Sequence, residues 1–555
     1  MGLVINKNTL SLLREKMEHR FLILILLLIT VVHFSIPIVA TWDTAHYHSY
    51  LDILYGKKSL ENWDVIRGPV FPVLIAFSHF LFGYSHIGML FGSYIVMLVV
   101  FFISVFFVKE LTNGVGNVIR YSLLWVVLFL NPVFLGFYHT ILTEYVASSL
   151  TILSVYISYL WVNHNLYGHT RAKFILLSLV LIVMNLLSFH LKQPYIGATF
   201  GPLVGASLFS IYFNGKIINI IQRFTVIVMT VLLLIASVIA WHHYLPDTGV
   251  ASKKERMSYY LVSDRLYRGL HSQLPEDMKK TQGKTVAQDM IVNGISLSDL
   301  SVTDIENDNT INYIDKKRAQ RMKSTGEVES YSFLFIADTD GKVIDKILVG
   351  GNPGIWRSAF ELIRIFVAHP VLSLKKYAGN YFEMTRLTGN PWRETEAIAF
   401  KSYEAKGFGN NVFWVMPSYE PLISPYKQFE INSIGYFPYR AFRGFALFLY
   451  PLLLNSLGAI WILFVLYGLY LSVKQSVIRK THVVKYSKIS AFIFISSFTI
   501  FFQILFPHVL LGATNDRYAF PAYSLSLLVL VIILLRCIAS ISKYLKKTGR
   551  ILEHR

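Results

Sequence analysis

Long apolar runs alternate with short polar loops along most of the chain, and this pattern predicts a polytopic membrane protein. A membrane-spanning helix needs roughly 20 consecutive, mostly apolar residues, and about ten runs approach that length. They lie near residues 21–40, 86–108, 121–138, 143–162, 174–191, 195–213, 224–243, 450–473, 488–506 and 518–537. The predicted fold class is therefore an all-α polytopic membrane protein with about ten transmembrane helices.

Two longer polar segments interrupt the runs and divide the chain. Residues 1–243 are predicted to be an N-terminal transmembrane catalytic module, whose first external loop spans 41–85. Residues 244–449, which hold 23 of the 33 acidic residues, form an extracytoplasmic domain or lid. Residues 450–555 form a C-terminal transmembrane module that ends in a basic tail.

The segment 244–449 is expected to be a mixed α/β domain. Two apolar stretches, 332–336 and 343–349, flank an Asp-Gly turn at 338–341, which is typical of a β-hairpin. Residues 354–388 show the apolar spacing of a helix and carry several basic side chains. Such a helix can rest on anionic lipid head groups or pack on the domain with a solvated basic face.

Lys and Arg residues are distributed unevenly between the two sides of the predicted bundle. Each loop on one side, the basic side, contains two to six Lys or Arg residues. The short loops on the other side hold only Lys192 and Arg517. The basic loops are 1–20, 109–120, 163–173, 214–223, 474–488 and 536–555. Because positive loops face the cytoplasm, both termini are expected there. The net charge of +19 follows mainly from this asymmetry, so nucleic acid is not an expected partner.

Two features near the ends of the chain limit its chemistry. The first apolar run ends in Ile38-Val39-Ala40, where only the last residue suits a signal-peptidase site, so an uncleaved anchor is expected. Cys537 is the single cysteine, which excludes an internal disulfide and a cysteine-based metal site.

The expected location is a cell membrane, which the chain crosses many times, in keeping with a bacterial plasma membrane.

A small set of charged residues falls on the side opposite the basic loops. Asp43 follows the first run and Glu144 opens the fourth, while Arg67, Lys192 and Arg517 supply positive charge. Charged groups at a membrane boundary are costly and are often functional. A carboxylate there can accept a proton, and Arg or Lys can bind phosphate. Each also has an ordinary interpretation: a helix cap for the acids, and snorkelling for the cations.

Histidines near this face are candidate ligands as well. His46 and His48 lie beside Asp43, but a tight metal site needs three or four placed ligands, so no metal or other cofactor is expected. His243 and its neighbour His242 end the seventh run. His243 is a candidate phosphate-binding donor, or a residue of the membrane interface.

The order of these motifs resembles that of the C-type (GT-C) glycosyltransferases, in particular the branch of protein O-mannosyltransferases and the lipid A aminoarabinose transferase. Shared features are an acid after the first span, a basic-Pro motif in the first external loop, an acid between spans three and four, a basic residue after span five and a late Arg-Tyr stretch. Here they are Asp43, Arg67-Gly68-Pro69, Glu144, Lys192 and Arg517-Tyr518. Asp43 is followed by Thr44, where protein mannosyltransferases usually carry a second acid, which disfavours protein mannosylation.

The resemblance implies an inverting transfer of one monosaccharide from a polyprenyl-phosphate donor to an extracytoplasmic hydroxyl of a glycan, lipid or protein. Asp43 would be the general base, Glu144 would position the sugar or acceptor, and Arg67, Lys192 and Arg517 would hold the phosphate. Two alternatives stay open. An O-antigen ligase or polymerase would use a diphosphate-linked glycan and depend on late-loop arginines. A transporter or flippase would show repeats and polar residues at mid-membrane.

Overall fold

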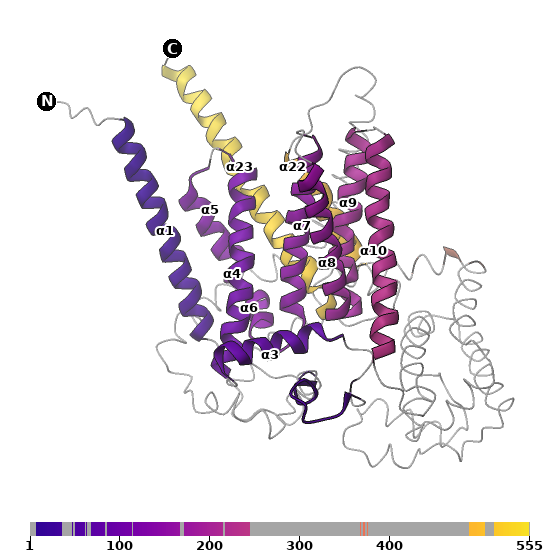
Figure 1. Ribbon diagram of the computed structural model, residues 1–555. Coiled ribbons are helices and arrows are strands. Elements are labelled where there is room, and N and C mark those ends of the chain that lie inside the picture. The colour runs from indigo at the N-terminus through magenta and orange to yellow at the C-terminus, as the bar shows by residue number, and fades with distance from the viewer. Residues whose placement is uncertain are drawn as a thin grey trace.

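The computed structural model describes the N-terminal helices and the last two long helices of the chain. The described residues are 7–35, 47, 50–60, 63, 68–83, 86–113, 115–166, 171–214, 217–244, 367, 370, 371, 375, 488–504 and 516–553. Within them every regular element is helical. Figure 1 shows the start of α1 (Lys7–Ser35) and the end of α23 (Phe520–Glu553) at the same end of the bundle, named here the terminal end; the other is the loop end. The helical prediction is thus confirmed for the described residues.

Most of the helices run along the bundle between its two ends (Figure 1). They are α1 (Lys7–Ser35), α4 (His86–Leu111), α7 (Glu144–Leu166), α8 (Arg171–Leu191), α9 (Ile196–Asn214), α10 (Ile217–Tyr244), α22 (Lys488–Ile504) and α23 (Phe520–Glu553). A further pass consists of α5 (Asn117–Leu124), the π-helical turn η2 (Trp125–Phe129) and α6 (Pro132–Tyr138). In contrast, α3 (Val70–Phe82) lies across the loop end.

Six helices of the described chain are long and apolar enough to cross a membrane. These segments are Lys16–Phe34, Gly88–Leu111, Glu144–Asn163, Ala172–Leu191, Ile220–Trp241 and Phe520–Leu545. The predicted runs 121–138, 195–213 and 488–506 coincide with shorter apolar helices, and 450–473 lies outside the described residues. The structure therefore supports a membrane-embedded helical protein, and the count of ten spans stays a prediction.

Nearly all of the segment 244–449 lies outside the described residues, including the expected hairpin at 332–349. Of the expected helix 354–388, the structure describes residues 367, 370, 371 and 375, and all four are helical. The mixed α/β character of this segment stays a prediction.

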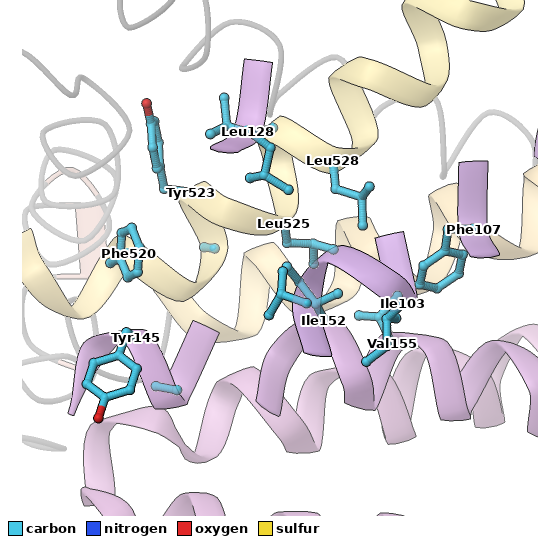
Figure 2. Packing of buried hydrophobic residues seen from close by; sticks show 14 of the residues in the cluster. Ile103, Phe107, Leu128, Tyr145, Ile152, Val155, Phe520, Tyr523, Leu525 and Leu528 are labelled. Atoms are coloured by element: carbon cyan, nitrogen blue, oxygen red, sulfur yellow. The ribbon is translucent and has the colours of Figure 1, made fainter. Parts of the chain in front are cut away.

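Apolar side chains from α4, η2, α7 and α23 meet in one buried cluster, which Figure 2 shows from close by. Leu128, Ile152 and Leu525 are completely buried there. The ring of Phe107 extends the cluster, because its centroid lies 5.1 Å from that of Tyr156 and 4.8 Å from that of Phe492 on α22. The last two helices are therefore packed into the N-terminal module.

Three glycines allow α9 and α22 to approach each other closely. Gly197, Gly201 and Gly205 recur every four residues and so share one face of α9. A Cβ atom on Gly197 would lie 2.6 Å from the carbonyl oxygen of Phe502, and one on Gly201 would lie 2.9 Å from the Cα atom of Thr499. Small residues at such contacts let helix backbones pack tightly where lipid removes the hydrophobic driving force.

This close contact makes Gly201 sensitive to one added methyl group. Gly201→Ala should lower the free energy of unfolding by about 1–3 kcal/mol, as overpacking of a tight core does. Gly116→Ala is the matched control, because a Cβ at Gly116 meets no atom within 4 Å. The midpoint of thermal unfolding in detergent measures both variants. Equal midpoints for the two would contradict the packing argument.

Candidate functional site

The predicted site residues come from five distant segments, and the structure describes them to different extents. The side chains of Glu144 and Lys192 are described. Of Arg517 and His243 it describes the backbone alone, in the 3₁₀ turn η9 (Asp516–Ala519) and at the end of α10. Asp43 lies outside the described residues, as does Arg67. All four described positions lie at the loop end of the bundle.

Glu144 is the first residue of α7 and is completely buried. The hydroxyl of Thr143 donates to its Oε2 at 3.3 Å, and the backbone N–H of Ala147 donates to the carbonyl of Thr143 at 3.0 Å. A carboxylate at this place is stabilised by the dipole of the helix N-terminus. Both the structural and the functional interpretation of Glu144 fit this geometry.

Aromatic side chains connect the segments that carry Asp43, Arg67 and Glu144. Tyr47 follows Asp43 by four residues, and its ring centroid lies 4.7 Å from that of Phe71, which follows Arg67 by four residues. Phe71 in turn lies 6.0 Å from the ring of Tyr145, the neighbour of Glu144. Tyr47 and Phe71 are fully buried. These contacts bring the flanks of the three predicted residues together.

Gly68, which follows Arg67, packs against the end of α8. A Cβ atom on Gly68 would overlap the backbone carbonyl of His190, so glycine is the residue that fits this position. Lys192 follows His190 by two residues. The glycine of the basic-Pro motif therefore meets the chain directly before Lys192.

Lys192 also faces the late Arg-Tyr stretch. Its half-buried side chain places Nζ 5.0 Å from the ring centroid of Tyr518, within the range of a cation–π interaction. Tyr518 follows Arg517 within η9, and its ring lies edge-on to that of Tyr195 at 5.8 Å. The backbone of Arg517 is thus held next to the neighbourhood of Lys192.

Gln503 fixes this arrangement from inside the bundle. Its fully buried Nε2 donates to the carbonyl of Tyr518 at 2.7 Å and to that of Pro194 at 3.3 Å. Pro194 lies two residues after Lys192, and Tyr195 donates its backbone N–H to the Lys192 carbonyl at 2.9 Å. One side chain of α22 therefore connects the turn after α8 with η9.

The loop end of α10 contacts the same region. The imidazole of His190 is 2.9 Å from the hydroxyl of Ser237, and the ring of Trp241 lies 5.6 Å from that of Trp63, between α1 and α3 in the sequence. Trp63 stacks on Tyr50 at 4.4 Å. The end of α10 that carries His243 is thereby packed beside the segment around Lys192.

His139 ties the turn before Glu144 to the end of α1. Its Nε2 lies 2.9 Å from the carbonyl oxygen of His33, and its Nδ1 lies 2.6 Å from that of Leu135. Burial lowers the pKa of the His139 imidazole, and the two carbonyl contacts oppose that shift because they favour the protonated ring. The contact holds the chain that leads to Asp43 close to the turn that carries Glu144.

Two residues of this region, Gln503 and His139, lie outside the motifs found in the sequence. Gln503 carried a signal, because an amide in the apolar run 488–506 is unusual in a membrane. His139 contacts α1, which is distant in sequence, and left no local pattern. Gly68 and Tyr518 belong to motifs found in the sequence, but their contacts with His190 and Lys192 are evident only from the structure.

Comparison of the chain with protein-family models, with curated proteins and with solved structures finds no significant match. The likeness to C-type glycosyltransferases therefore rests on the sequence motifs. Among the residues that the structure describes, no three His, Cys, Asp or Glu side chains form a group that could hold a metal ion. His46 and His48 lie outside those residues, so metal independence stays a prediction.

Removing the Gln503 amide tests how firmly it holds the site region. Gln503→Leu keeps most of the side-chain volume but takes the donor from two buried carbonyls, which should cost about 1–3 kcal/mol of stability. Thr225→Val is the control, because this hydroxyl is exposed and bonds within its own helix. Unfolding rates in SDS-containing mixed micelles report the difference. If both variants unfold equally fast, the anchoring role of Gln503 is wrong.

Proposed function

We propose that this chain is an integral-membrane glycosyltransferase of the C type. It transfers a single monosaccharide from a polyprenyl-phosphate donor to a hydroxyl of a glycan, lipid or protein, and it inverts the anomeric centre. The reaction takes place at the loop end of the bundle, which the positive-inside distribution assigns to the extracytoplasmic face.

One observation supports this proposal above the others. The chain segments next to Asp43, Arg67, Glu144, Lys192 and Arg517 meet at one end of the bundle, through the contacts of Tyr47, Phe71, Tyr145, Gly68 and Tyr518. These segments are scattered over almost the whole chain, so the sequence alone does not require them to meet. Clustering of acids with cations is what an acid–base reaction on a phosphate-linked substrate needs.

In the proposed reaction, Asp43 takes the proton of the acceptor hydroxyl as the acceptor oxygen forms a bond to the anomeric carbon. The bond from that carbon to the phosphate oxygen breaks on the opposite face. Its electron pair leaves with the phosphate, so the products are the glycosylated acceptor and a polyprenyl phosphate. Atoms and charge balance without a further reactant.

The cations act on the leaving group. Negative charge grows on the phosphate as the glycosidic bond breaks, and fixed positive charges stabilise that state more than the bound substrate. Lys192 supplies a point charge oriented by the ring of Tyr518, and Arg67 and Arg517 supply planar groups suited to bidentate contact. Glu144 positions the sugar or the acceptor, and His243 is a further donor to phosphate.

The assignment of the base is tested by Asp43→Asn. The amide cannot accept the proton, so transfer should fall by about 10²–10⁴-fold, the usual contribution of a general base. Mass spectrometry of lipids and surface glycans should then show loss of one monosaccharide and accumulation of its polyprenyl-phosphate donor. Asp52→Asn is the matched control, because Asp52 lies in the same loop and pairs with Lys58 at 2.8 Å on the surface. Unchanged glycans in Asp43→Asn cells would contradict the assignment of Asp43 as the general base and would favour the polymerase or transporter alternatives.

The phosphate contact is tested by Lys192→Ala. Loss of one charge-assisted contact should weaken donor binding by about 10–100-fold, which corresponds to about 1.5–3 kcal/mol. Lys58→Ala is the control, since this exposed lysine belongs to a surface pair of small energetic weight. Equilibrium binding of a short-chain polyprenyl-phosphate sugar to the purified chain measures both. Equal affinity for the two variants would exclude the role of Lys192.

A further inference from the structure

At the opposite, terminal end, the bundle encloses a guanidinium that takes no part in the proposed reaction. Arg223 lies in the second turn of α10 and is only 1% exposed. Its Cζ atom lies 4.9 Å from the ring centroid of Trp161 on α7, and Nη1 is 3.4 Å from the carbonyl oxygen of Ala206 on α9. The indole of Trp161 is itself fixed, because its N–H donates to Ser178 at 3.0 Å.

These contacts leave the charge of Arg223 without a counter-charge. Within the described residues, Nη2 has no hydrogen-bond partner, and no salt bridge reaches the guanidinium. An arginine side chain does not lose its proton in a protein, so the buried guanidinium stays positively charged. A buried ion is strongly unfavourable unless a charge of opposite sign accompanies it.

Among the described residues, no carboxylate serves this purpose. The sequence contains no Asp or Glu between Glu144 and Asp247, so α8, α9 and α10 contribute none. At the terminal end, Glu110 bonds Lys488 at 2.9 Å, and Glu18 accepts from the side chain of Asn117. The end of α23 and all of α1 lie on the far side of the bundle from α10 (Figure 1). No acid of the described residues is thus placed to neutralise Arg223, and an anion from another molecule would do so.

The surroundings of Arg223 indicate which molecule that is. Its neighbours Ile221 and Phe224 are 59% and 65% exposed, and the outward face of α10 is apolar along most of its length. Such a face is covered by lipid acyl chains in a membrane. Ser210 lies one helical turn from Ala206, further toward the terminal end, and its buried hydroxyl also has no hydrogen-bond partner among the described residues.

We propose that Arg223 and Ser210 bind the phosphate group of an anionic phospholipid from the leaflet at the terminal end. The phosphate enters between α9 and α10 and accepts hydrogen bonds from Nη2 of Arg223 and from the Ser210 hydroxyl. The guanidinium keeps its contacts with Trp161 and Ala206, and the acyl chains lie along Ile221 and Phe224. This site is separate from the proposed active site at the loop end and does not depend on it.

Native mass spectrometry of the delipidated full-length chain tests this site. The probes are phosphatidylglycerol, a diacylglycerol without phosphate, and inorganic phosphate. We expect the wild-type chain to retain one phosphatidylglycerol, Arg223→Gln to weaken this binding at least tenfold, and diacylglycerol not to be retained. Arg120→Gln is the control, because Arg120 lies at the same end but already donates to Thr112 and Asn117 at 3.0 and 2.6 Å.

Three outcomes would overturn the proposal. Equal retention by wild type and Arg223→Gln, or equal loss in Arg120→Gln, would show that Arg223 is no specific ligand. Displacement of the lipid by equimolar inorganic phosphate would identify a site for free phosphate instead. Should Arg223→Gln fail to fold, the wild-type chain decides: phosphatidylglycerol must raise its thermal midpoint and diacylglycerol must not, and equal effects of the two would refute the lipid site.

Discussion

The close contact between α9 and α22 holds the two halves of the described chain together. Where lipid surrounds a helix, burial of apolar side chains supplies little driving force, and tight backbone packing takes its place. Gly197, Gly201 and Gly205 make that packing possible because they present no Cβ atom to α22. The contact places Gln503 beside the turn after α8, and so the late η9 turn meets a segment more than 300 residues earlier.

A second constraint acts at the loop end, where polar segments of the chain border the apolar helices. Backbone groups there have no water on one side and need internal partners. The imidazole of His139 contacts two such carbonyls, those of Leu135 and His33, and Gly68 lets the loop backbone approach His190 closely. Aromatic rings such as Tyr47 and Phe71 fill the space between these ties. The region is thereby packed firmly enough to orient charged side chains.

The two ends of the bundle differ in the charged residues that they contain. At the loop end the proposed site gathers acids and cations, as a reaction with changing charge requires. At the terminal end acids are scarce, and Glu110 is already bonded to Lys488. Arg223 therefore depends on the anionic lipid that also favours basic loops on that side. The shortage of carboxylates at this end is thus the basis of the proposed lipid site.

The sequence by itself determined the helical, membrane-embedded class, because apolar runs of spanning length leave few other structures open. It also singled out Glu144 and Lys192, since charges at the edge of an apolar run stand out locally. Only the tertiary structure decided that Lys192 faces Tyr518, that Gly68 meets His190 and that Arg223 is buried without a carboxylate. Each of these depends on contacts between helices far apart in sequence, where periodicity fixes which face is apolar but not which partner covers it.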